Sequence, residues 1–164
     1  MQKKIVFSLM AAICLTSTFS WAEVYISAEE AIKQIFPTHQ EYKKERHILD
    51  HREFEVYSVS KNGELLGRAV VLDERGKIQP ITFLVGIDAQ GRVLDVYVLE
   101  FRDIFGSEIK RRSFLRQFSG KSLKDHIAVG RDIDAVTSAT ISSQAAASAV
   151  KEALRVSEEL KKDF

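Results

Sequence analysis

Apolar and polar residues alternate with a period of two through the middle of the chain, which is typical of β-strands. Four segments share this pattern: residues 54–60, 64–72, 78–87 and 92–101. Asn62-Gly63, between the first two, is the dipeptide that most favours a tight hairpin, and further turns are expected at 73–77 and 89–91. The pattern predicts four antiparallel strands in a meander, with Pro80 at a sheet edge or a bulge.

Helical spacing of apolar residues appears on both sides of these strands. Ser27 to Glu30 has the form of a capping box and predicts a helix from about Ala28 to Phe36, which ends at Pro37. After the strands, a short amphipathic helix that ends at Gly120 is predicted from Ile109, Phe114, Leu115 and Phe118.

The last helix has the clearest pattern. Nine residues form one apolar face at helical spacing: Ile141, Ala145, Ala146, Ala149, Val150, Ala153, Leu154, Val156 and Leu160. A helix with such a face is expected to pack across the sheet. The sequence therefore predicts a single α+β domain from about Glu23 to Phe164, an antiparallel β-meander packed against a long C-terminal helix and shorter helices.

The segment from Thr38 to Arg52 is polar and contains three histidines, His39, His47 and His51. His47 and His51 stand four residues apart and would share a metal ion if this stretch were helical. No further ligand cluster accompanies them in the sequence, so ordinary solvated histidines are the favoured interpretation and no metal site is expected.

The N-terminus has the features of a secretory signal peptide over residues 1–22. Lys3 and Lys4 precede an apolar run from Ile5 to Leu15, and the small-residue site Ser20-Trp21-Ala22 predicts cleavage after Ala22. A retained membrane anchor is the alternative, but eleven apolar residues fall short of the roughly 20 that cross a bilayer. The expected location is periplasmic or secreted.

The composition of the predicted mature chain excludes several kinds of chemistry and of binding partner. The single cysteine, Cys14, lies within the predicted signal, so the mature chain would have no thiol for disulfides or for metal binding. Without Lys3 and Lys4, 22 basic and 23 acidic residues remain, which gives a net charge of −1. Because a nucleic-acid-binding protein usually carries an excess of basic residues, nucleic acid is not expected as a partner. The sequence shows no nucleophile–base set and no paired catalytic carboxylates, which favours a carrier over a stand-alone enzyme.

An unusual number of hydroxyl groups precedes the last helix, in the stretch Asp134 to Ser143, DAVTSATISS. One capping hydroxyl would be enough for a helix start, and a Ser/Thr-rich cap is the ordinary interpretation. The backbone N–H groups of a first helical turn also attract a phosphate, and Thr140 is predicted to stand at or next to that turn.

The whole stretch resembles the flavinylation motif of the FMN-binding domain family, which includes subunits of the sodium-pumping NADH:quinone oxidoreductase and of the Rnf complex. In that motif an acidic residue, here Asp134, precedes a Ser or Thr, a small residue, an Ala and the Thr that carries FMN. The acceptor would be Thr140, after Ala139. Thr137 and Ser138 stand where the membrane-complex subunits usually have Ser-Gly.

A second stretch, residues 81–106, is similar to the paired strands of the family and the segment that follows them. Gly106 is kept, whereas Asp103, Ile104 and Phe105 replace the usual Glu, Thr and Pro. The resemblance places the flavin ring between residues around Glu100 to Gly106 and the start of the last helix. Phe105 is expected either to stack on the ring or to belong to the core.

The resemblance implies a covalent cofactor and a function for the domain at residues 23–164. A magnesium-dependent flavin transferase would use FAD as donor, esterify Thr140 with FMN and release AMP. The product would be an extracytoplasmic electron-transfer protein, peripheral to the cytoplasmic membrane or free, with redox proteins as partners. Two alternatives remain at this point: a flavin-dependent reductase of a small extracytoplasmic substrate, and a flavin-free binding module of the same fold.

Overall fold

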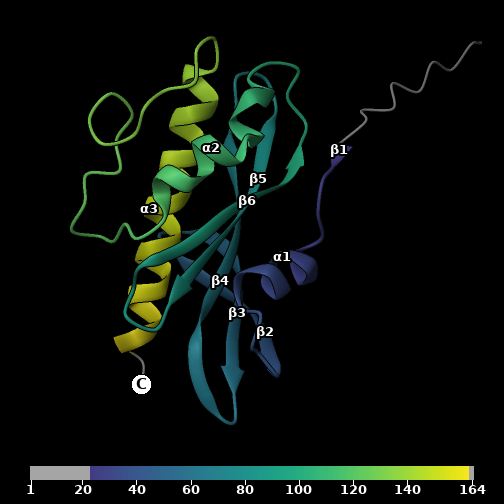
Figure 1. Cartoon of the computed structure of the whole chain (residues 1–164), viewed down its shortest axis with the longest axis vertical. Helices are drawn as coiled ribbons and strands as arrows, with labels where there is room; N and C mark the ends of the chain where they lie inside the picture. The colour runs from purple at the N-terminus through teal and green to yellow at the C-terminus, as the bar shows by residue number, and fades with distance from the viewer. Residues whose placement is uncertain (1–22, 163–164) are drawn as a thin grey trace, which may run out of the picture.

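Six antiparallel strands form the central sheet of the computed structural model, which describes residues 23–162 (Figure 1). The predicted signal peptide lies outside the described residues. The strands are β1 (Glu23–Val24), β2 (Glu41–Leu49), β3 (Arg52–Lys61), β4 (Glu64–Arg75), β5 (Pro80–Asp88) and β6 (Val93–Phe101). Their order in the sheet is β1-β6-β5-β4-β3-β2. β3 to β6 form the predicted meander, β2 extends it by one strand, and β1 pairs with the end of β6.

The turns of the meander agree with the sequence prediction at two places and differ at the third. Asn62 and Gly63 have φ values of 52° and 79°, the left-handed conformations that a tight hairpin needs. The turn between β4 and β5 lies at Gly76–Gln79, later than predicted, because β4 continues to Arg75. Pro80 is the first residue of a central strand, where its missing N–H is tolerated, and the prediction of an edge or bulge was wrong.

The prediction of four strands was too low, because β1 and β2 have no period-two pattern of apolar residues. β2 is an edge strand whose side chains are exposed or only half-buried, so its sequence is polar and charged on both faces. His47 lies on this strand and His51 in the turn after it. The helical spacing that a shared metal would require is therefore not present.

The helices match the prediction in place, with one difference in form. α1 (Ala28–Ile35) starts at Ser27, whose Oγ accepts a hydrogen bond from the Glu30 N–H at 3.1 Å. The predicted short helix is a chain of three pieces: the 3₁₀ helix η1 (Ser107–Lys110), α2 (Arg112–Leu115) and the 3₁₀ helix η2 (Arg116–Phe118). The long final helix, α3, spans Thr140–Lys162. Among residues 23–162, none of the helices combines the length and the apolar composition needed to cross a membrane.

The two faces of the sheet have separate cores. α3, in yellow in Figure 1, packs on one face, where its alanines and Val150, Leu154 and Val156 meet strand residues such as Phe83 and Val85. α1 covers part of the other face with Ala31 and Ile32. Both helices bury their apolar stripes in this way, which confirms the predicted α+β architecture.

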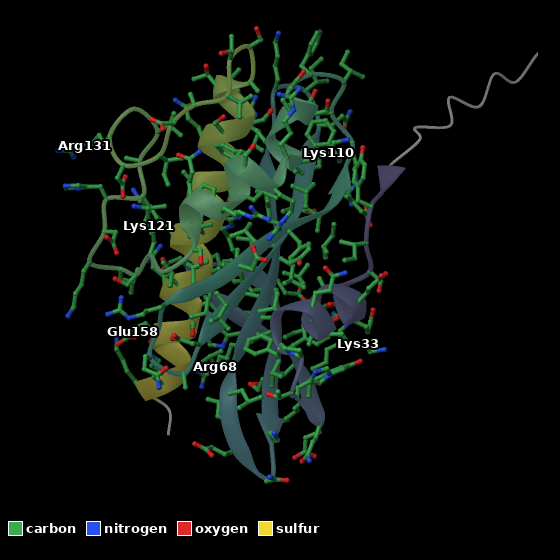
Figure 2. All side chains as sticks on the ribbon, in the orientation of Figure 1. Lys33, Arg68, Lys110, Lys121, Arg131 and Glu158 are labelled. Atoms are coloured by element: carbon green, nitrogen blue, oxygen red, sulfur yellow. The ribbon has the colours of Figure 1, made fainter. Side chains whose placement is uncertain are left out.

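Arg68 fixes the far end of α3. Its side chain is buried on β4, close to the C-terminal end of α3 (Figure 2). Its Nη2 donates a hydrogen bond to the Leu160 carbonyl at 3.3 Å. Burial lowers the pKa of Arg68, but a cation at a helix C-terminus is favoured by the helix dipole. This contact ties the C-terminal turn of α3 to the sheet, so the N-terminal turn is held at the opposite end of the domain.

Candidate functional site

A pocket of about 230 Å³ lies at the N-terminus of α3, between that turn and two loops. One loop joins β4 to β5, and the other leads from β6 into η1. The eight residues that line the pocket are Lys77, Phe105, Gly106, Ser138, Ala139, Thr140, Ile141 and Ser142. The structure therefore brings together five of the eight residues singled out in the sequence: Thr140, Ser138, Ala139, Phe105 and Gly106.

Thr140 is the first residue of α3, and its side chain is exposed. The residue before it is Ala139, whose carbonyl accepts the first helical hydrogen bond from the Ser143 N–H at 2.8 Å. Alanine has no side-chain acceptor, so a hydroxyl cap is absent at this position. In the part of the chain that the structure describes, no side chain accepts a hydrogen bond from the backbone N–H groups of residues 140–142. The positive end of α3 is therefore left open toward the pocket.

Two of the surplus hydroxyls have structural roles. Ser143 is fully buried, and its Oγ donates to the Ala139 carbonyl at 2.9 Å and accepts from the Val136 N–H at 3.2 Å. The Oγ of Ser142, also buried, donates to the Phe105 carbonyl at 3.4 Å. These bonds hold the segments before α3 and before η1 against the helix, and they leave Thr140 as the exposed hydroxyl of the first turn.

A tight turn at Thr137-Ser138 delivers the chain to α3. The Ala139 N–H donates to the Val136 carbonyl at 3.0 Å, and Ser138 has a φ of 64°, in the left-handed region. Glycine adopts this conformation without steric cost, whereas other residues are strained there. The need for a positive φ at position 138 explains why glycine suits this position of the flavinylation motif.

We expect Ser138→Gly to leave the free energy of unfolding unchanged or slightly higher, and Ser138→Val to lower it by about 1–2 kcal/mol. A β-branched side chain is especially unfavourable at positive φ. Urea unfolding followed by circular dichroism measures both values. Thr137→Val is the matched control, because Thr137 is also exposed but has an ordinary φ. An equal loss at positions 137 and 138 would contradict the role of backbone strain.

The loop before η1 approaches α3 closely at Gly106. Gly106 has a φ of 84°, and a Cβ atom built there would lie 2.9 Å from the Ser142 Cβ and still closer to its Oγ. Only glycine fits this position. The close approach places the half-exposed Phe105, of which 45% is accessible, on the wall of the pocket.

Asp103 joins the two loops that form the pocket. Its side chain is 6% exposed, and its carboxylate accepts hydrogen bonds from the N–H of Ile78 at 2.9 Å and of Phe105 at 3.3 Å. Burial alone would raise the pKa of Asp103, but the surrounding backbone N–H groups outweigh burial and hold the pKa below its usual value. Asp103 therefore fastens the β4–β5 turn to the segment before η1.

We expect Asp103→Ala to lower the free energy of unfolding by about 1–2 kcal/mol at pH 7, because it leaves two part-buried N–H groups without an acceptor. The folded-state pKa lies below the unfolded value of about 3.9, so this stabilisation is complete above that pH and is lost as the pH falls through the folded pKa. Urea unfolding between pH 7 and pH 3 should show the gap between variant and wild type closing in acid. Asp103→Asn, which keeps one acceptor oxygen, is the control; a gap independent of pH would contradict the assignment.

The other predicted site residues lie outside the pocket. Thr137 is exposed in the turn before it. Asp134 is exposed too, and its main chain is held by Gln117, whose Oε1 accepts from the Asp134 N–H at 2.8 Å and whose Nε2 donates to the Asp134 carbonyl. Glu100 points into a different pocket, where it is paired with Arg102. The geometry thus gives Glu100 no contact with the Thr140 pocket.

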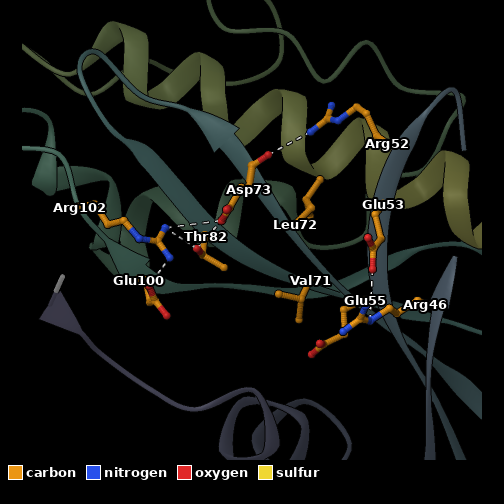
Figure 3. A pocket seen from close by; sticks show the side chains of 10 residues that line it. All are labelled: Arg46, Arg52, Glu53, Glu55, Val71, Leu72, Asp73, Thr82, Glu100 and Arg102. Carbon is orange, nitrogen blue, oxygen red and sulfur yellow. Dashed lines mark hydrogen bonds and ion pairs between the residues drawn. The ribbon is translucent and has the colours of Figure 1, made fainter. Parts of the chain in front are cut away.

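That second pocket is larger, about 670 Å³, and lies on the sheet across from α3 (Figure 3). Its charged side chains already neutralise one another: Arg102 reaches Glu100, Thr82 and Asp73, and Arg46 pairs with Glu53 at 3.2 Å. The smaller pocket is therefore the candidate ligand site, because its helix terminus and lysine have no anionic partner among the described residues.

Three of the eight lining residues were not predicted as site residues from the sequence: Ile141, Ser142 and Lys77. Lys77 lies in the β4–β5 turn, and its Nζ is 4.1 Å from the centroid of the Phe105 ring. Nothing in the local pattern distinguishes it from other turn lysines, because its importance comes from a contact between residues 28 positions apart. Within residues 23–162, no group of three or more His, Cys, Asp or Glu side chains is placed to hold a metal ion.

The sequence was compared with known proteins, and the matched range contains all the residues that line the pocket. The model of the FMN-binding domain family matches residues 76–155, a range that begins at the β4–β5 turn and ends within α3. The chain is 30% identical over 118 residues to a subunit of the Na⁺-translocating ferredoxin:NAD⁺ oxidoreductase complex of Acetobacterium woodii. The alignment covers 66% of this chain and 57% of the relative, so the chain spans little more than half the length of that relative.

Proposed function

Because residues 76–155 belong to the FMN-binding domain family, we propose that the chain carries FMN on Thr140 through a phosphoester bond and transfers electrons outside the cytoplasm. The observation that carries the proposal is the exposed Thr140 hydroxyl at the uncapped N-terminus of α3. It opens onto a pocket whose lining includes a cation and an exposed aromatic ring, the groups that a flavin phosphate and a flavin ring require.

The residues of the pocket fit a flavin nucleotide. The free N–H groups of the first turn of α3 suit a phosphate at Thr140, and the small side chains of Ser138 and Ala139 leave its hydroxyl accessible to a modifying enzyme. The apolar side chains of Ile104, 76% exposed, and of Phe105 and Ile141, each 45% exposed, provide the surface on which the isoalloxazine would rest. Such a flavin would stay open to redox partners, as an electron carrier requires.

Attachment is a phosphoryl transfer from FAD catalysed by a magnesium-dependent flavin transferase. The Thr140 oxygen forms a new bond to the phosphorus of the FMN half, the bond from that phosphorus to the bridging oxygen breaks, and AMP leaves with the bridging oxygen. The threonine proton passes to a base of the transferase. Asp134 remains exposed six residues from the acceptor, a position suited to recognition by that enzyme.

A covalent bond suits a protein outside the cytoplasm. FMN is made inside the cell, so a reversible site would lose its cofactor by mass action at a low external concentration. The flavin supplies the redox chemistry, and the protein supplies position and electrostatics. The related Acetobacterium woodii protein is a subunit of an oxidoreductase complex, which supports redox proteins as the partners of this chain.

The test is the intact mass of the chain after co-expression and export with a flavin transferase. We expect the mass of the polypeptide from residue 23 plus one FMN less water, and visible flavin absorbance that remains after denaturation. Digestion should place the added mass on the peptide that contains Thr140. A colourless chain of polypeptide mass would overturn the proposal and favour the flavin-free binding module.

A further inference from the structure

The pocket at Thr140 contains a single charged side chain. Of the eight lining residues only Lys77 is ionised at neutral pH, and the others are apolar, small or hydroxylic. Lys77 comes from the β4–β5 turn, far from α3 in the sequence, and the buried carboxylate of Asp103 fixes that turn through the Ile78 N–H. The lysine is therefore held at the pocket by the fold and not by its neighbours along the chain.

The ammonium group of Lys77 lies over the ring of Phe105, 4.1 Å from its centroid. No anionic side chain pairs with Lys77 among the described residues. A cation over an aromatic ring at an exposed site is only weakly held, whereas an ammonium paired with a phosphate oxygen forms a strong, charge-assisted hydrogen bond. Lys77 would therefore interact more strongly with a phosphate in the pocket than it does with the Phe105 ring.

We propose that Lys77 is the counter-ion of the phosphodiester formed at Thr140, and that it exchanges the Phe105 ring for the phosphate when the flavin is attached. The exchange has two consequences. It neutralises the one negative charge that attachment adds to the pocket, and it uncovers the Phe105 ring for contact with the isoalloxazine. Lys77 is thus a positioning residue for the flavin. This inference depends on the proposed function, since it requires the phosphoester at Thr140.

The test uses ³¹P NMR of the flavinylated chain at pH 7, where a phosphodiester carries one negative charge and its chemical shift reports on the groups that contact it. Lys77→Gln removes the ammonium group and should move the resonance toward that of a free flavin phosphodiester.

Two further variants separate this role from general effects. Lys77→Arg keeps the charge and should hold the resonance near its wild-type position. Lys33→Gln removes a lysine on α1, well away from the pocket (Figure 2), and should leave the resonance unchanged. Circular dichroism of each variant excludes unfolding as the source of a shift. A resonance that stays at its wild-type position in Lys77→Gln would overturn the inference while leaving the covalent flavin in place. A wild-type chain without phosphorus would overturn the proposed function and the inference together.

Discussion

Thr140→Val is expected to abolish covalent flavin completely while leaving the fold intact. The substitution removes the one atom that would form the phosphoester bond, and the side chain is exposed at the start of α3. Exposed substitutions of similar volume usually change the free energy of unfolding by no more than about 0.5 kcal/mol. Intact mass and flavin absorbance of the denatured chain measure the first effect, and urea unfolding measures the second.

Two variants serve as controls for Thr140→Val. Thr38→Val removes an exposed threonine hydroxyl in the turn after α1, outside the pocket, and should keep the full flavin mass. Thr140→Ser retains a hydroxyl at the acceptor position and should restore attachment in part or in full. Yellow colour that remains on denatured Thr140→Val would show that the flavin is bonded elsewhere, and the assignment of the acceptor would be wrong.

Gly106→Ala is expected to lower the free energy of unfolding by about 2–4 kcal/mol and to reduce flavin attachment. An L-residue at a φ of 84° is strained, and the new Cβ would collide with Ser142 in the first turn of α3. Either the loop before η1 or the N-terminus of α3 must move, and each carries part of the pocket. Urea unfolding and the fraction of flavinylated chain by mass spectrometry measure the two effects.

The chain offers a matched control at Gly120. Its φ is 79°, almost the same as that of Gly106, but a Cβ built there has nothing within 4 Å. Gly120→Ala should therefore cost only the conformational strain, about 1–2 kcal/mol, and leave flavin attachment unchanged. Equal losses in the two variants would show that the close approach of Gly106 to α3 is not needed for the site.

The sequence alone was sufficient for the elements that have a strong local signal. The Asn62-Gly63 hairpin is confirmed, and so is the α3 stripe except for Ile141, which is exposed at the pocket. Turn conformation and helical periodicity depend on residues close together in the chain. The place of Thr140 at the start of α3 follows from the same local pattern. The polar edge strand β2 was missed, because an exposed edge strand requires no alternation of apolar residues.

Only the tertiary structure decided which side chains surround Thr140. It brings Lys77 and Phe105 to the pocket from two separate loops, joins those loops through Asp103, and directs Glu100 to another pocket. Periodicity and motif spacing describe one segment at a time, whereas a binding pocket depends on contacts between segments. The proposed acceptor could thus be predicted from the amino-acid sequence, but its electrostatic surroundings depend on how the sheet and α3 pack together.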